Sequence, residues 1–236
     1  MTLVQSLWYT FIPVAAAIGG STIAILRDPS EAVQSAFQHI SAGIIFGAVA
    51  LELLPPIRTQ FPLIAVLGFS LGIAAMVALR SLSKSFDAGF TAARSRGFVA
   101  ASAIDVLIDG FVLGATFKLG MKQGLLLTVA LTFGLLFLSL SVATTLSHAK
   151  LSRPLIVLAT SGMSLAMPLG AALGTILLHD AGTPVLATVL AFGSVVLMYI
   201  VTEELLVRAH RVRRSSWAMP LFFLAFLGYL VIDELG

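Results

Sequence analysis

The chain has 236 residues, of which 58% are hydrophobic and only 11% are charged, and its formal net charge is +3. Ordinary soluble domains carry about 25% charged residues, so this chain lacks the polar side chains to cover a surface in water. It contains no cysteine, which excludes disulfide bonds and thiolate metal ligands. The composition predicts an integral membrane protein that forms a single domain over residues 1–236.

Eight apolar runs follow one another along the chain, each close to the length of about 20 residues with which a helix crosses the hydrocarbon core. The runs are continuous rather than alternating, which favours helices over the strands of a barrel. They lie at residues 7–26, 36–54, 61–79, 98–117, 124–146, 154–178, 185–207 and 217–232. The fourth and fifth are so close that a tight turn must join them. The sequence therefore predicts an all-α fold, a polytopic transmembrane bundle of eight helices.

The basic residues indicate how these helices are oriented. Most of them fall in alternate connections, whereas the other connections hold only Arg58, Lys118 and Lys122. Since cytoplasmic loops are enriched in Lys and Arg, the first set marks the cytoplasmic side, and both termini are predicted outside the cell membrane. Because this set is spread over four loops, we expect the lipid bilayer as a partner and no nucleic acid. It consists of Arg27, Arg80, Lys84, Arg94, Arg96, Lys150, Arg153, Arg208, Arg211, Arg213 and Arg214.

Glycines at four-residue spacing occur in four of the predicted spans. Such pairs let two helix backbones approach closely, and we interpret them as packing positions rather than as a chemical site. The pairs are Gly43 and Gly47, Gly68 and Gly72, Gly110 and Gly114, and Gly170 and Gly174.

Carboxylates at membrane depth are the residues most informative about function, because each costs at least about 2.5 kcal/mol at the centre of a spanning helix. Asp105 and Asp109 lie inside the fourth span, four residues apart, so both lie on one face of that helix. There they can converge on one cation in the bundle interior. A structural alternative is that each carboxylate satisfies a hydroxyl or amide group of a neighbouring helix.

Two similar leucine-rich runs carry further acidic residues: Glu52 in ELLP at 52–55, and Glu203 with Glu204 in TEELL at 202–206. By the orientation argument, the first run ends a helix outside the cell and the second ends a helix inside. An inverted repeat predicts related motifs at opposite membrane faces, and such repeats are common in secondary transporters. The alternative is that leucine-rich helix ends near an interface often carry a carboxylate.

Several short motifs occur in order along the chain: Gly19-Gly20, HISAG at 39–43 leading to ELLP at 52–55, SG at 161–162 with PLGA at 168–171, and the terminal IDELG at 232–236. In this order they resemble the ZIP family of divalent-metal transporters, the zinc- and iron-regulated transporter-like proteins, over nearly the whole chain. The resemblance implies eight helices in a 3+2+3 inverted-repeat arrangement, with a divalent metal ion as substrate.

The resemblance also implies a paired metal centre on the fourth and fifth helices, where family members typically carry His-Asn-x-Pro-Glu-Gly on the fourth. Here that stretch is DVLIDG at 105–110, with Asp105 in place of the His and Asp109 in place of the Glu. On the fifth helix the corresponding pattern falls on LSLSVA at 138–143, which leaves only the Ser139 hydroxyl, and Met167 stands where many members have Glu. Such an altered, single, oxygen-rich site suits a harder cation than zinc.

The function that follows is ZIP-like transport of a divalent metal cation, with no prosthetic group. The predicted metal ligands are Asp105, Asp109, Ser139, Glu52 and Glu204. One alternative is a ZIP-fold protein that has lost metal transport and carries another solute or a proton, and another is a protein that transports nothing. The sequence contains no catalytic triad pattern, metalloprotease motif or phosphate-binding loop, so we do not expect an enzyme. The sequence leaves a homodimer open.

The four histidines contribute little to this prediction. His39 is interpreted as a packing or anchoring residue at one end of the second span. His148, His179 and His210 lie in or beside predicted loops, and we expect them to be solvated.

Overall fold

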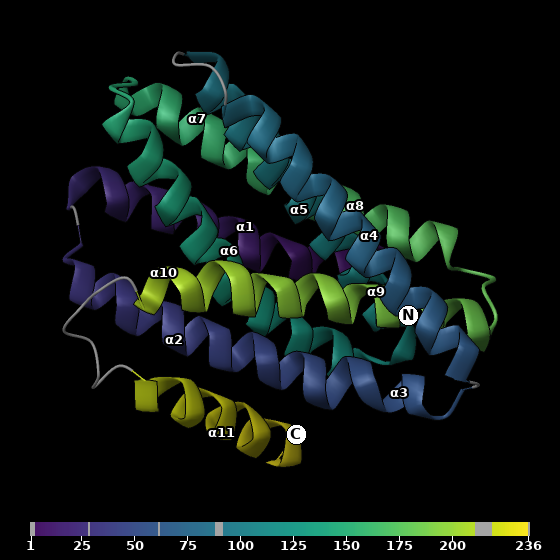
Figure 1. The fold of residues 1–236 in the computed structure, drawn as a ribbon. Helices are drawn as coiled ribbons and strands as arrows, with labels where there is room; N and C mark the ends of the chain where they lie inside the picture. Colours follow the sequence, from purple (N-terminus) through teal and green to yellow (C-terminus); the bar gives the residue numbers. More distant parts are fainter. Residues whose placement is uncertain (1–2, 28, 61, 88–91, 211–218, 236) are drawn as a thin grey trace.

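The computed structural model describes residues 3–27, 29–60, 62–87, 92–210 and 219–235, and within these ranges every regular element is a helix. Figure 1 shows the helices as one bundle in which α11 lies along the outside of α2. The elements in the first half are α1 (Leu3–Leu26), α2 (Glu31–Ala48), η1 (Val49–Leu53), α3 (Leu54–Arg58), α4 (Pro62–Asp87) and α5 (Ala92–Leu119). In the second half they are α6 (Met121–His148), α7 (Arg153–Ser164), α8 (Ala166–Leu177), α9 (Thr183–Tyr199), η2 (Ile200–Leu205), α10 (Leu206–His210) and α11 (Met219–Leu235).

These elements combine into eight long helices within the described part of the chain. The segments α2, η1 and α3 follow one another without a break, as do α9, η2 and α10, while α7 and α8 meet at Leu165. The tight turn predicted after the fourth span consists of Gly120 alone. The prediction of an all-helical bundle is therefore confirmed.

Seven of the helices are long and apolar enough to cross a membrane, which is consistent with a multi-pass membrane protein. The remaining helix, α11, has 17 residues within the described ranges. The predicted starts of the third span at Phe61 and of the eighth at Trp217 lie outside the described residues, as do Arg211, Arg213 and Arg214 of the orientation argument.

Both described ends of the chain lie near the turn between α5 and α6. Tyr9 of α1 stacks on Phe117, with the ring centroids 6.1 Å apart. Asp233 of α11 forms an ion pair with Lys122, at 3.0 Å between Nζ and Oδ1. The first and last helices therefore have their outer ends on the same side of the bundle.

Glycines allow the closest helix contacts. A Cβ added at Gly170 of α8 would lie 2.0 Å from the Leu107 carbonyl oxygen of α5, and one added at Gly110 would lie 2.2 Å from the Met167 carbonyl oxygen of α8. No side chain fits between two backbones at such distances. Comparable contacts join α4 to α9 at Gly68 and α2 to α11 at Gly43. The glycine pairs are packing positions, as their spacing predicts.

Two helices change to a π-helical turn where the acidic motifs lie. The turn η1 contains Glu52, and η2 contains Glu203 and Glu204. A π-helical turn fits an extra residue into the helix and often marks a functional position. The two similar leucine-rich runs thus share an unusual backbone conformation as well as a sequence pattern.

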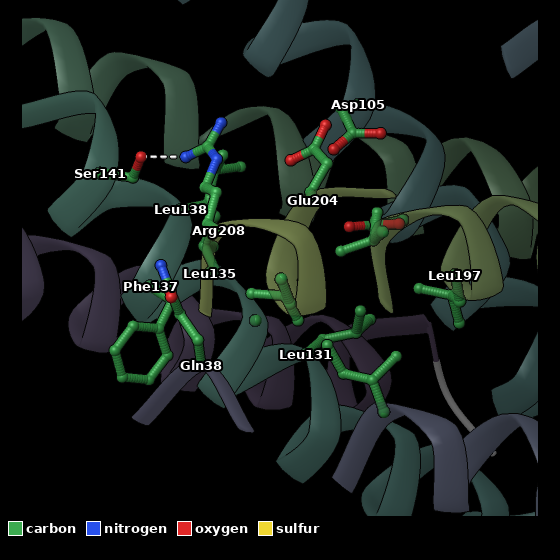
Figure 2. Close-up of a pocket in the computed structure, with 15 residues that line it drawn as sticks. Gln38, Asp105, Leu131, Leu135, Phe137, Leu138, Ser141, Leu197, Glu204 and Arg208 are labelled. Atoms are coloured by element: carbon green, nitrogen blue, oxygen red, sulfur yellow. Dashed lines mark hydrogen bonds between the residues drawn. The ribbon is translucent and has the colours of Figure 1, made fainter. Parts of the chain in front are cut away.

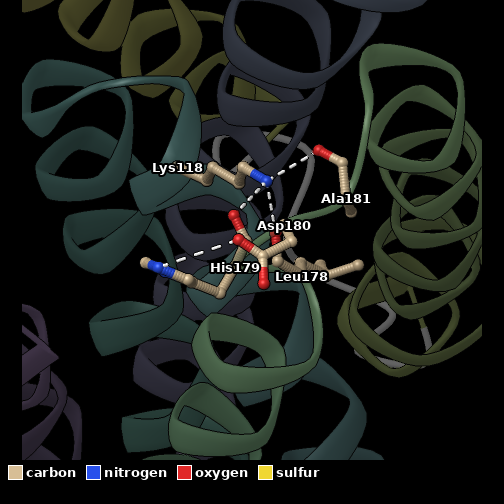
Figure 3. Close-up of polar contacts among 5 residues, drawn as sticks. All are labelled: Lys118, Leu178, His179, Asp180 and Ala181. Atoms are coloured by element: carbon tan, nitrogen blue, oxygen red, sulfur yellow. Dashed lines mark hydrogen bonds and ion pairs between the residues drawn. The ribbon is translucent and has the colours of Figure 1, made fainter.

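Lys118 caps the C-terminal end of α8. Figure 3 shows the Lys118 amine, at the end of α5, among three backbone carbonyl groups. Its Nζ donates hydrogen bonds to the carbonyl oxygens of Leu178, of His179 at 2.9 Å and of Ala181 at 2.7 Å. The last carbonyls of a helix have no partners within it, so Lys118 satisfies groups at the end of α8 and holds the following loop against α5.

The packing role of glycine is tested by two neighbouring positions in α1. A Cβ added at Gly20 would lie 2.4 Å from the Leu136 carbonyl oxygen, whereas one at Gly19 would meet nothing within 4 Å. We expect Gly20→Ala to lower the free energy of unfolding by about 1–3 kcal/mol, through overpacking. The control Gly19→Ala should leave stability unchanged or raise it by up to about 1 kcal/mol, since alanine favours helix. Thermal unfolding in detergent measures both, and equal melting temperatures would contradict this packing.

Candidate functional site

The helix α5 carries two carboxylates into the interior of the bundle. Asp105 and Asp109 are 8% and 7% exposed, respectively. Both line one cavity, to which α2, α6, α9, η2 and α10 also contribute. The same helix packs against α8 through Gly110 and Gly114. The structure thus places the two carboxylates beside an interior cavity and not on the outer surface of the bundle.

A third carboxylate joins them from η2. Glu204 lines the same cavity, and Figure 2 shows its carboxyl group beside that of Asp105. The preceding residue, Glu203, is exposed and forms an ion pair with Arg80 of α4 at 3.4 Å. Consecutive residues of η2 therefore direct one carboxylate into the cavity and the other to the surface of the bundle.

The cavity is small and mostly apolar. Its volume is about 30 Å³, and a water molecule needs about 10–15 Å³ of such space, so it has room for a water molecule or a small ion. Leucine, isoleucine and phenylalanine side chains form much of the wall. Its polar lining residues are Gln38, Asp105, Asp109, Ser141, Glu204 and Arg208.

The charges in this cavity are not balanced. Asp105 lies close enough to Asp109 and Glu204 to interact electrostatically with both, and Asp109 interacts in the same way with Glu204. Arg208 is the one cationic side chain among the described residues that line the cavity, and its guanidinium donates a hydrogen bond to the Ser141 hydroxyl. Asp109 Oδ1 is buried and has no hydrogen-bond partner within the described residues. Buried carboxylates without partners attract cations or protons strongly.

A wider cavity, which we call the vestibule, shares part of its lining with the cavity of the three carboxylates, which we call the acidic cavity. Its volume is about 250 Å³, and its lining includes Glu31 at the start of α2 and Thr145 near the end of α6. It shares Gln38, Phe137, Ser141 and Arg208 with the acidic cavity. Arg208 and Ser141, whose hydrogen bond Figure 2 shows, therefore line both the vestibule, at this end of the bundle, and the acidic cavity.

Ser139, one of the predicted ligands, lies elsewhere. Its buried hydroxyl donates a hydrogen bond to the Leu135 carbonyl oxygen at 2.8 Å. It lies against α1, where a Cβ added at Gly20 would be 3.0 Å from Ser139 Oγ. Because two residues turn a helix by about 200°, Ser141 and not Ser139 is the α6 hydroxyl that lines the cavity.

Glu52 also lies away from the acidic cavity. It is 3% exposed, and its Oε1 has no hydrogen-bond partner among the described residues. Its charged neighbours are Asp233 and Lys122, near the turn between α5 and α6, and the Tyr229 hydroxyl close by is buried without a partner in the described part of the chain. The structure therefore brings together three predicted ligands, Asp105, Asp109 and Glu204, and leaves two apart.

The described residues contain no group of three or more His, Cys, Asp or Glu side chains that could hold a metal ion as they stand. The three carboxylates share a cavity without forming a ready-made coordination shell. A divalent ion in this cavity would keep part of its water shell, as magnesium commonly does, or would draw the side chains closer together.

Sequence reasoning missed three of the polar lining residues: Gln38, Ser141 and Arg208. Arg208 was interpreted only as a loop charge that sets orientation. Its position four residues after Glu204 places the two on one helical face, which is the signal that could have assigned it to the cavity. Gln38 and Ser141 had no comparable signal, because isolated polar residues in apolar helices are common.

No protein-family model matches the chain, and no curated protein matches it. The class is therefore defined by the architecture: the described residues form an all-helical bundle with a buried acidic cavity, and seven helices long and apolar enough to span a membrane are consistent with a multi-pass membrane protein.

A charge-neutral substitution separates a cation-binding role of Asp109 from a structural one. Asp109→Asn keeps the size of the side chain but removes a charge from the cavity, so we expect the fold to survive and ion-dependent stabilisation to disappear. In the wild type, a bound ion at one hundred times its Kd should add about 2.7 kcal/mol. Without ion, the variant should melt at or above the wild-type temperature, because a buried charge without a partner is costly.

The control for this experiment is Asp180→Asn, at an exposed residue outside the cavity, which should behave as the wild type. Thermal unfolding with and without added divalent ion measures all three proteins. An Asp109→Asn protein that melts earlier but still gains stability from the ion would contradict the cation-binding role.

Proposed function

We propose that the protein transports a divalent metal cation across the membrane and that the cation passes through the cavity lined by Asp105, Asp109 and Glu204. The observation that supports this most directly is the sharing of one buried cavity by three carboxylates in a bundle of membrane-length apolar helices. Charged residues within a membrane bundle commonly mark an ion pathway. The resemblance to ZIP transporters favours the same substrate class.

The ligand chemistry favours a hard cation. Each charged acceptor in the cavity is a carboxylate, and the neutral polar groups are the Gln38 amide and the Ser141 hydroxyl. Oxygen donors suit magnesium and manganese, whereas zinc prefers nitrogen and sulfur. We therefore propose that manganese or magnesium is carried in preference to zinc.

We also propose that the helices follow a 3+2+3 inverted repeat, with α5 and α6 as the central pair. If the first three long helices correspond to the last three, the packing of α1 on α6 should correspond to that of α8 on α5, and α4 on α9 to α11 on α2. All four contacts occur. The two π-helical turns, η1 and η2, also lie in corresponding helices. Such repeats commonly provide alternating access in transporters.

Orientation follows from the same proposal. Lys150 and Arg153, which follow α6, and Arg208 belong to the predicted cytoplasmic set and lie at the vestibule end of the bundle. The vestibule would then open to the cytoplasm, and both chain ends, near the turn between α5 and α6, would lie outside. At that outer end Glu52 and Tyr229 are buried, which supports an inward-open state of the transporter.

Proton transport is the second candidate. It is favoured by the small size of the cavity and by the lack of a ready-made coordination shell among the described residues. A carboxylate such as Asp109, with an unpartnered oxygen within the described structure, can take up and release a proton without further ligands.

Reconstituted vesicles distinguish these functions. We expect saturable uptake of Mn²⁺ that is at least tenfold slower in the double variant Asp105→Asn with Asp109→Asn and unchanged in Asp180→Asn. Uptake of Zn²⁺ should be slower than uptake of Mn²⁺ at equal concentration, because the cavity offers oxygen donors. Internal metal-sensing and pH-sensing dyes measure the two fluxes. Carboxylate-dependent proton flux without metal uptake would support the second candidate, and metal uptake unaffected by the double variant would contradict this pathway.

A further inference from the structure

Two histidines far apart in the sequence meet between α2 and α10. The ring centroids of His39 and His210 are 5.3 Å apart, and the ring planes meet at 63°. His39 is 2% exposed, while His210 is exposed at the end of α10. Neither residue lines the acidic cavity or its vestibule.

Backbone carbonyl groups fix the same tautomer in both rings. His39 Nδ1 lies 2.8 Å from the Ser35 carbonyl oxygen, and His210 Nδ1 lies 2.6 Å from the Leu206 carbonyl oxygen. A carbonyl oxygen only accepts hydrogen bonds, so each Nδ1 carries the proton and donates it. Each Nε2 of the neutral ring therefore keeps its lone pair, as in most metal-binding histidines, whose other nitrogen donates to a carbonyl or carboxylate group.

The His39 Nε2 atom is buried and has no hydrogen-bond partner within the described residues. A buried polar atom is normally satisfied, so an unpartnered lone pair beside a second imidazole indicates that a ligand belongs there. The exposed His210 ring provides the side from which it can enter.

The separation of the rings suits a shared metal ion. Zinc binds imidazole nitrogen at about 2.0 Å, and the ring centroid lies about 1.1 Å behind the nitrogen, so two rings at a tetrahedral angle have centroids about 5 Å apart. The observed 5.3 Å matches this value. The ions that prefer nitrogen donors are those of the later first-row transition metals.

We propose that His39 and His210 bind one late first-row divalent ion, such as Zn²⁺ or Co²⁺, through their Nε2 atoms, with water completing the coordination. Two protein ligands make an exchangeable site rather than a permanent structural one. The site is separate from the acidic cavity, and it forms whether or not the protein transports a cation. The contrasting interpretation is an edge-to-face ring pair with a purely packing role.

The test is titration of the purified full-length protein in detergent with CoCl₂ and with ZnCl₂, followed by calorimetry and, for cobalt, by the visible absorption of tetrahedral Co²⁺. In the double variant Asp105→Asn with Asp109→Asn, in which the acidic cavity has lost two carboxylates, one ion should bind per chain, with the strong absorption typical of four-coordinate cobalt. Added to this double variant, His39→Gln and His210→Gln should each weaken binding at least tenfold. The matched control, His148→Gln with His179→Gln in the same background, changes two exposed histidines elsewhere and should leave binding unchanged.

Measuring the binding in this double variant separates the histidine site from the transport proposal. If His39→Gln does not fold, the exposed His210→Gln variant decides alone. No binding by the double variant Asp105→Asn with Asp109→Asn, or binding that persists when His210→Gln is added to it, would overturn the site and leave the ring pair as packing.

Discussion

Placing negative charge inside an apolar bundle is the constraint on which the rest of this structure depends. A carboxylate on a membrane helix cannot face hydrocarbon without a large cost, so Asp105 and Asp109 fix the rotation of α5 about its own axis. With the carboxylates toward α9 and η2, Gly110 and Gly114 of the same helix meet α8. The close backbone contact between α5 and α8 thus holds the opposite face of α5, with its two carboxylates, toward the cavity.

The π-helical turns extend this principle to the neighbouring helices. Consecutive residues of a helix lie about 100° apart around its axis, which is enough for η2 to set the Glu204 carboxylate in the cavity and the Glu203 carboxylate on Arg80. Glu52 lies in the other π-helical turn, η1, buried near the opposite end of the bundle. Buried acidic groups at two levels, with a vestibule beside one of them, fit the alternating-access transport that we propose.

Hydropathy was sufficient to predict the helices, because each span needs about 20 apolar residues, and four-residue spacing was sufficient to predict the glycine contacts. The predicted second and seventh spans were shorter than the helices, since polar ends such as Glu31 and His210 continue the helix beyond the apolar run. Ser139 was chosen by motif position, and the helix rotation selects Ser141 instead. The meeting of His39 with His210 had no sequence signal, because it depends on how α2 packs against α10.

The central claim is that the acidic cavity binds a cation, and the most direct measurement is a crystal structure of the protein grown with MnCl₂, with anomalous data collected at the manganese edge. The account predicts an anomalous peak in the cavity, within coordination distance of at least two of Asp105, Asp109 and Glu204, completed by water. An empty or water-filled cavity at saturating manganese, with all three carboxylates bonded to protein groups, would contradict it.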